Sequence, residues 1–127
     1  MENFPVEERI KKRTEIRKIL RKGKSAYAYG AKLSVLEAEQ KDSSQSFSRI
    51  AFTFGPKYGN AVQRNRAKRL GREAYRHVRK SIKPGYDLVL MVFQPKDKKY
   101  DARYQDRLRQ LKNLFYKANL FKGRRTQ

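Results

Sequence analysis

The side chains best suited to chemistry in this sequence are the cations between residues 57 and 80. Lysine and arginine recur there at intervals of three and four residues, so a helix would gather them on one face. Arginine predominates, and its planar guanidinium group can bind a phosphate through two hydrogen bonds or stack on a base. This pattern indicates binding of a nucleic acid. The cations of this face are Arg64, Lys68, Arg69, Arg72, Arg76, Arg79 and Lys80, with Arg66 at its edge.

An ordinary solvated helix surface is the alternative interpretation of this segment. Such surfaces usually mix charges, because acids and bases four residues apart attract each other. Here like charges stand four apart, as in Arg64 and Lys68, and Glu73 is the acid that interrupts the face. We therefore favour a polyanionic partner. At about 100° per residue, the opposite arc forms an apolar stripe that should face the core: Ala67, Leu70, Gly71, Ala74 and Val78.

The start of this helix carries a second signal for anion binding. Asn60 is a favourable N-cap, and Gln63 stands three residues later, as in a capping box. The first backbone N–H groups of a helix have no partner within it and attract anions. With Lys57 beside them, they are predicted to form an anion site.

Composition limits the possible partners. Lys and Arg number 33 against 12 Asp and Glu, a formal net charge of +21, which attracts nucleic acid or an anionic membrane surface. There is no cysteine, so thiolate metal sites and disulfides are excluded. His77 is the one histidine, and we expect it at the surface and assign no metal ligand. No apolar run approaches the roughly 20 residues of a membrane span, and the N-terminus is polar, so we expect a cytoplasmic protein.

The elements that must position these cations follow from apolar periodicity. With 8 Tyr and 7 Phe, the chain has enough patterned apolar residues for one folded domain, residues 1–127, with loose ends at about 1–6 and 122–127. Polar turns are expected at 41–46 and 95–99. The predicted fold is α+β, a single two-layer sandwich in the order α-β-β-β-α-β-α. Helices are expected over 7–21, 61–82 and 101–120, and extended structure over 25–40, 47–54 and 86–93.

The run from Lys57 to Glu73 resembles the signature of the bacterial ribonuclease P protein family. A Gly-Asn-Ala-Val turn at 59–62 leads into Arg-Asn-Arg at 64–66, followed by Lys-Arg at 68–69 and Arg-Glu at 72–73. A single Arg-Asn-Arg would be weak support, whereas the whole run is specific. The looser similarity extends over about residues 10–121, including Gly23 and Ser25 after the first helix.

The resemblance implies a function and a fold. Ribonuclease P removes the 5′ leader from precursor tRNA by phosphodiester hydrolysis, and its RNA subunit performs the catalysis with Mg²⁺ held mainly by RNA. The protein subunit would bind that RNA, one protein per RNA, and the single-stranded leader, with no catalytic residue of its own. No membrane or DNA partner is expected. The implied fold resembles the second domain of ribosomal protein S5.

The resemblance also assigns roles to residues. The predicted leader contacts lie in a cleft between the first helix and the sheet, at Ile16, Leu20, Ser34, Thr53, Lys57 and Arg64. The predicted contacts to the RNA subunit are Asn60, Arg64, Asn65, Arg66, Lys68, Arg69 and Arg72.

The cleft departs from the family pattern. Aromatic residues are common in the family where Ile16, Leu20 and Ser34 stand, and Pro56 replaces a usual basic residue before Lys57. Stacking of a base on an aromatic ring contributes about 1–3 kcal/mol. Tyr27 or Tyr29 would compensate if either faces the cleft. Each assignment has a plain alternative: Ile16 and Leu20 as core residues, Ser34 and Thr53 as ordinary strand residues, and Asn65 as a polar surface residue.

Three other classes of protein remain as alternatives. A ribosomal or other structural RNA-binding protein would share the charge, the size and the fold, and the signature run argues against it. A protein nuclease acting alone needs clustered acids or a base beside a nucleophile, whereas the acids here are few and scattered. A membrane-surface protein needs helices with a broad apolar face flanked by cations, which the two clearest helices lack.

Overall fold

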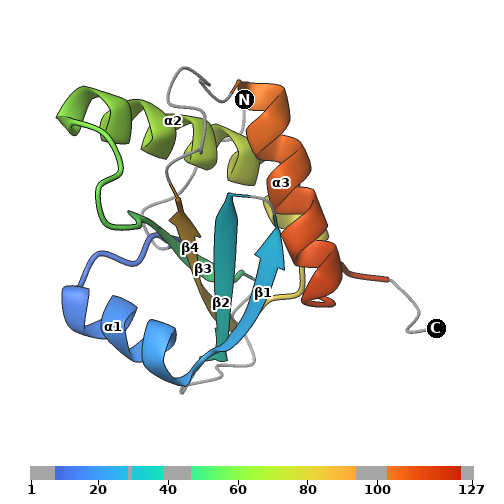
Figure 1. Ribbon diagram of the computed structural model, residues 1–127. Coiled ribbons are helices and arrows are strands. Elements are labelled where there is room, and N and C mark those ends of the chain that lie inside the picture. Colours follow the sequence, from blue (N-terminus) through green and yellow to red (C-terminus); the bar gives the residue numbers. More distant parts are fainter. Residues whose placement is uncertain (1–7, 29, 39–46, 94–102, 124–127) are drawn as a thin grey trace.

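The chain forms a sheet with helices on both of its faces in the computed structural model (Figure 1). The structure describes residues 8–28, 30–38, 47–93 and 103–123. Its order confirms the predicted α+β class and the succession α-β-β-β-α-β-α. In chain order the elements are α1 (Arg13–Lys22), β1 (Lys24–Ala28), β2 (Ala31–Glu37), β3 (Arg49–Phe54), α2 (Ala61–Val78), the short 3-10 helix η2 (Arg79–Ser81), β4 (Tyr86–Val92) and α3 (Tyr104–Lys117).

The sheet has the strand order β1-β2-β4-β3. The β1–β2 and β2–β4 pairs are antiparallel, whereas β3 and β4 are parallel and are joined through α2. Strand β4 has a neighbour on each side and helices over both of its faces, so its residues 87–90 are buried. This confirms the predicted central strand, which ends at Val92 and leaves Phe93 exposed. The expected extended segment 25–40 is a hairpin that turns at Gly30, where φ is +80°.

Side chains alternate between the two faces of the sheet, and each face has its own core. On one face, α2 and α3 cover a cluster that includes Leu33, Ile50 and Phe115. On the other face, α1 packs through Ile19 against Val89, with Ala51 and Ile10 in the same cluster. The sheet and the α2–α3 pair are the two expected layers, and α1 adds cover to the opposite face (Figure 1).

The first helix is shorter than predicted. It begins at Arg13 rather than at residue 7, because the preceding residues make tertiary contacts instead of helical ones. The backbone N–H of Ile10 donates to the carbonyl of Ile50 at 3.0 Å, and Arg9 pairs with Ile50 in parallel. The segment thus extends along β3, and the side chain of Ile10 is buried beneath α1.

The other two helices also end earlier than predicted. The α-helical geometry of α2 stops at Val78 and tightens into η2. Helix α3 ends at Lys117 because Asn119 adopts a left-handed conformation with φ of 58°. The N–H of Leu120 then donates to the carbonyl of Phe115 at 2.9 Å, which is the usual hydrogen bond of a Schellman ending.

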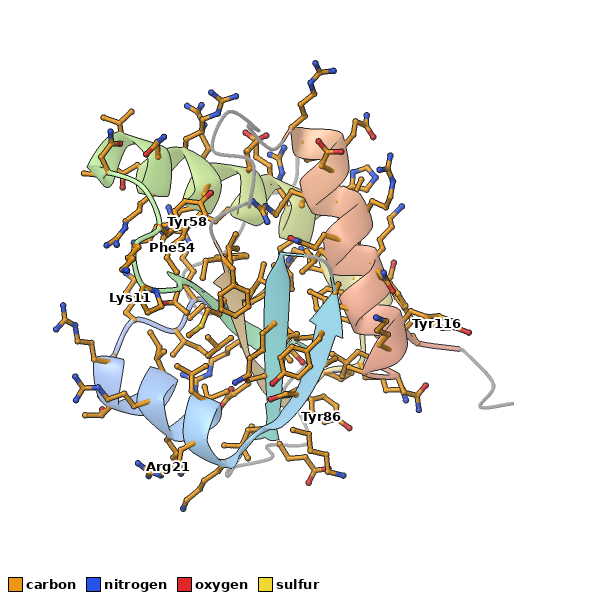
Figure 2. All side chains as sticks on the ribbon, viewed as in Figure 1. Lys11, Arg21, Phe54, Tyr58, Tyr86 and Tyr116 are labelled. Carbon is orange, nitrogen blue, oxygen red and sulfur yellow. The ribbon has the colours of Figure 1, made fainter. Side chains whose placement is uncertain are left out.

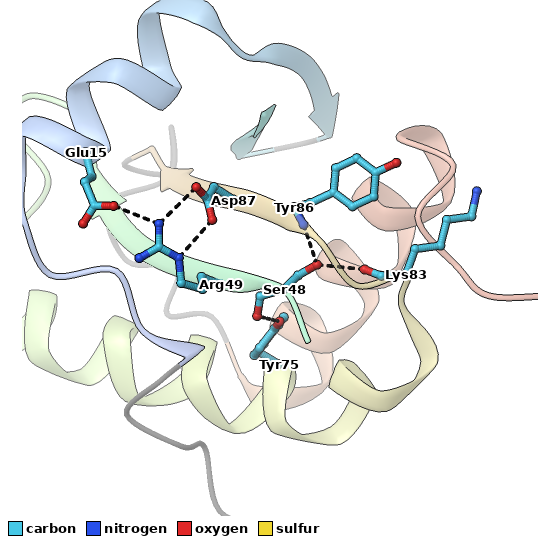
Figure 3. A network of polar contacts seen from close by, with 7 residues as sticks. All are labelled: Glu15, Ser48, Arg49, Tyr75, Lys83, Tyr86 and Asp87. Atoms are coloured by element: carbon cyan, nitrogen blue, oxygen red, sulfur yellow. Dashed lines mark hydrogen bonds and ion pairs between the residues drawn. The ribbon is translucent and has the colours of Figure 1, made fainter. Parts of the chain in front are cut away.

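An ion network fastens α1 to the sheet (Figure 3). The guanidinium group of Arg49 donates to both carboxylate oxygens of Asp87 at 3.0 Å and to Glu15 of α1 at 2.8 Å. The hydrogen bond to Asp87 is the main cause of a raised pKa at Arg49. Nearby, the hydroxyl of Ser48 donates to the carbonyl of Lys83 at 2.8 Å and accepts from the N–H of Tyr86 at 3.0 Å. Both networks join segments that are more than 30 residues apart in the sequence.

Several expected features lie outside the described residues: the polar turns at 41–46 and 95–99, Tyr29, and the ends at 1–6 and 124–127. At the end of the described chain, the N–H of Lys122 donates to the carbonyl of Ser81 at 2.7 Å. None of the described helices combines the length and apolar character needed to cross a membrane.

Candidate nucleic-acid interface

The turn before α2 has the capping geometry that its sequence predicts. The side chain of Asn60 accepts a hydrogen bond from the backbone N–H of Gln63 at 2.9 Å, and the side chain of Gln63 accepts from the N–H of Asn60 at 2.8 Å. Gly59 has φ of +40°, and a Cβ atom there would lie 2.3 Å from the side-chain oxygen of Gln63. The capping box therefore requires glycine at position 59. Lys57, also at positive φ, is exposed in the same turn.

Arg64 is held against this turn by two side-chain contacts. Its Nε donates to the backbone carbonyl of Tyr58 at 2.7 Å, and its guanidinium carbon lies 6.0 Å from the centroid of the Phe54 ring. The Phe54 and Tyr58 rings are 4.9 Å apart, and both lie below the first turns of α2 (Figure 2). The exposed side chain of Arg64 is thus oriented before any ligand binds, which lowers the entropic cost of binding. The support of Arg64 by Phe54 and Tyr58 was not predicted from the sequence, where the two aromatic residues flank a Gly-Pro turn.

The predicted RNA-subunit contacts lie together on one surface. Helix α2 buries Ala67, Gly71 and Ala74 against the sheet and α3, and the opposite surface is exposed. Gly71 permits close packing, because a Cβ atom there would lie 2.8 Å from the ring of Phe52. Lys68 is half-buried, and the other predicted contacts are exposed. We call this surface the α2 basic face: Asn60, Arg64, Asn65, Arg66, Lys68, Arg69 and Arg72.

Arg79 does not belong to this face, contrary to the sequence interpretation. Its guanidinium group forms an ion pair with Glu8, whose side chain is buried. A charge paired in this way is a structural group rather than a phosphate ligand. Helical periodicity placed Arg79 with the exposed cations because it cannot show the pairing with Glu8, which is 71 residues away in the chain. His77 is exposed, as expected.

The predicted leader contacts are divided between a covered and an open part of the sheet face that carries α1. Ile16 and Leu20 are half-buried at the edge of the cluster formed by Ile19 and Val89. Both alternatives for them, core and cleft wall, are therefore compatible with their position. Ser34, by contrast, lies beneath α1 with an exposed fraction of 0%.

Thr53 lies in the open part of the same sheet face. It pairs with Met91, which pairs with Lys32, and Lys32 pairs with Tyr27 of the edge strand β1. The first three of these side chains are half-buried and Tyr27 is exposed. Because β3 runs directly into the turn that holds Lys57, this open row adjoins the N-terminal end of the α2 basic face (Figure 1).

Similarity to known proteins agrees with this arrangement. The family model described as ribonuclease P matches residues 4–119. The ribonuclease P protein component of Clostridium novyi is 37% identical over 114 residues, covering 90% of this chain and 96% of the relative. That of Clostridium acetobutylicum is also 37% identical, with 90% and 91% covered.

Solved structures share the fold. The ribonuclease P protein of Staphylococcus aureus, in a mutant form, superposes with a TM-score of 0.73 at 23% identity, covering 91% of each chain. The protein from Thermotoga maritima superposes with a TM-score of 0.71 at 24% identity, covering 87% of this chain and 96% of that protein. The capped turn, the α2 basic face and the family match over most of the sequence lead to one conclusion: this chain belongs to the ribonuclease P protein family.

Proposed function

We propose that this chain is the protein subunit of ribonuclease P, which binds the catalytic RNA subunit through the α2 basic face and the 5′ leader of precursor tRNA through the α1 side of the sheet. The protein contributes no catalytic group. Hydrolysis of the phosphodiester bond belongs to the RNA subunit, with Mg²⁺ held mainly by RNA. One protein acts with one RNA in the cytoplasm.

The α2 basic face is the observation that carries this proposal. Its cations project from a single rigid helix, and the capping box fixes the helix start beside Lys57. Rigid placement matters because the phosphates of a folded RNA have fixed positions, so a preorganised cation loses little entropy when it binds one. Arginine adds bidentate geometry that lysine lacks.

A leader site on the α1 side follows from the properties of single strands. Unpaired nucleotides are bound by apolar or aromatic surfaces for the bases and cations for the backbone. The partly exposed Ile16 and Leu20 supply an apolar wall, and Thr53 lies on the open sheet face. Lys57 and Arg64 stand at the boundary between this face and α2, where one RNA strand could contact both surfaces.

Cleavage of a precursor tRNA at low Mg²⁺ concentration tests the function. The substrate is incubated with bacterial ribonuclease P RNA, with and without the protein, and with the protein alone. We expect accurate removal of the leader to be faster with both components and absent with the protein alone. If the protein binds the RNA without accelerating cleavage, it is a structural RNA-binding protein of the ribosomal type. Cleavage by the protein alone would support the nuclease alternative.

A further inference from the structure

Two exposed aromatic rings lie on the open part of the sheet face that carries α1. Tyr27 is 59% exposed and Phe93 is 36% exposed. Among the described residues, four large hydrophobic side chains are at least 36% exposed. Of these four, Tyr27 and Phe93 lie on the same face of the sheet. Both come from segments that the family signature does not include. Aromatic rings that are accessible on a folded sheet can stack on the bases of a single-stranded nucleic acid.

The strand register shows that Tyr27 faces the same side as α1. Residues paired across neighbouring strands share a face, so Tyr27, Lys32, Met91 and Thr53 form one row across the four strands. The preceding row holds Ser34 and Val89, which α1 covers. The row with Tyr27 therefore lies just beyond the covered part of the face.

Phe93 directly follows the last residue of β4 and is two residues after Met91, so its side chain lies on the same face. Its N–H donates to the carbonyl of Gly30 at 2.9 Å, and the N–H of Gly55 donates to the carbonyl of Val92 at 2.9 Å, so the sheet pairing continues to this point. A Cβ atom on Gly55 would lie 2.7 Å from the Phe93 ring. The ring thus rests on the backbone of Gly55, and the glycine provides the space for it.

Charge on this surface favours a polyanion. Lys32 lies 6.0 Å from the centroid of the Tyr27 ring, and the row contains no acidic residue. Among the residues that the structure describes, the acids Asp87 and Glu15 lie at the other end of this face and are bound to Arg49. On the β3 side, the surface continues into the turn that holds Lys57. Aromatic rings alternating with cations are the usual composition of a single-strand site.

We propose that Tyr27 and Phe93 stack on bases of the 5′ leader, while Lys32 and Lys57 bind its phosphates. This proposal rests on the proposed function and extends it. The two rings would replace the aromatic side chains that are missing at Ile16, Leu20 and Ser34. The leader then runs across the open end of the sheet, between α1 and the turn before α2. With strands about 4.8 Å apart and about 3.3 Å per residue along them, the two positions are roughly 12 Å apart, enough to hold more than one nucleotide.

Binding measurements on the reconstituted holoenzyme test this site. The protein is assembled with bacterial ribonuclease P RNA, and its affinity is compared for precursor tRNA and for the same tRNA without a leader. Tyr27→Ala should weaken binding of the precursor by about fivefold or more and leave the leaderless tRNA unchanged. Tyr27→Phe should retain the affinity, because it keeps the ring. Phe93→Leu, which keeps apolar packing on Gly55, should weaken precursor binding in the same selective way.

Tyr116→Ala is the matched control. Tyr116 is 54% exposed on α3, which packs on the opposite face of the sheet, so its removal should not change leader binding. The proposal is overturned if Tyr27→Ala and Phe93→Leu bind the precursor as well as the parent protein does. It is also overturned if they weaken precursor and leaderless tRNA equally, which would assign the surface to another RNA segment. In both cases the parent holoenzyme still cleaves, whereas failure of the proposed function would appear as no acceleration by the parent protein.

Discussion

Arg79, just after α2, donates hydrogen bonds from its Nε to both carboxylate oxygens of Glu8, at 3.0 and 3.1 Å. Glu8 is 2% exposed, and the residues that follow it extend along β3. The pair therefore fixes the N-terminal segment to the end of the helix that carries the α2 basic face. Burial raises the pKa of the Tyr75 hydroxyl, and the negative charge of Glu8 raises it further.

Glu8→Ala should destabilise the protein by about 3 kcal/mol, because it removes the buried carboxylate that neutralises the mostly buried guanidinium group of Arg79. Urea unfolding measures the change. Arg109→Ala is the control: Arg109 lies 3.7 Å from Asp106 in an exposed pair, so its loss should change the free energy of unfolding by less than about 0.5 kcal/mol. Equal effects of the two substitutions would show that the Glu8 pair has no special role.

The same pair shows where prediction from sequence fails. Periodicity identified α2 correctly from Ala61, because its cap and its apolar stripe are local features. Whether Arg79 faces solvent depends on Glu8, which is 71 residues away in the chain. Likewise, residues 8–12 have the composition of a helix, and their pairing with Ile50 overrides it. Local patterns predicted the elements, and contacts between distant segments decided the boundaries.

Arg64→Ala combined with Arg69→Ala should weaken binding to the RNA subunit and reduce its dependence on salt. The slope of log K against log salt is negative, and each lost phosphate contact reduces its magnitude by about 0.7–0.9, so the double substitution should reduce the magnitude by about 1.4–1.8. Affinity measured at several salt concentrations gives the slope. The control is Arg109→Ala with Lys112→Ala, which removes the same charge from exposed positions on α3. An equal loss of slope in the control would mean that net charge, and not the α2 basic face, governs binding.

Gly59→Ala should disrupt the capping box, because its Cβ atom would collide with the side chain of Gln63. The loss should exceed the cost of about 1 kcal/mol expected for Asn60→Ala, which removes one capping hydrogen bond. Gly85→Ala is the matched control, since Gly85 also has positive φ but has no neighbouring atom within 4 Å of its Cβ position. Urea unfolding separates the three variants. If Gly59→Ala is no worse than Gly85→Ala, the collision has no energetic importance.

The leader cleft was less predictable than the α2 basic face. Tyr27 was a candidate only if it faced the cleft, and the orientation of a strand residue depends on its register with its neighbours. Phe93 was not a candidate, because it was assigned to a buried strand and its exposure depends on where that strand ends. Ser34 and Thr53 point to the same face of the sheet, but Ser34 is buried and Thr53 is only half-buried. The difference depends on how far α1 extends over the sheet, which strand periodicity does not show.

Ser34→Ala decides whether the predicted contact of Ser34 with the leader occurs. Its hydroxyl is completely buried and has no hydrogen-bond partner among the described residues, so removing it should stabilise the protein by about 1 kcal/mol. If α1 stays in place during binding, the affinity of the holoenzyme for precursor tRNA should be unchanged. Urea unfolding and precursor binding are measured on the same variant. A stable variant that has lost leader affinity would show that α1 moves away and exposes Ser34, and the predicted contact would then hold despite the burial.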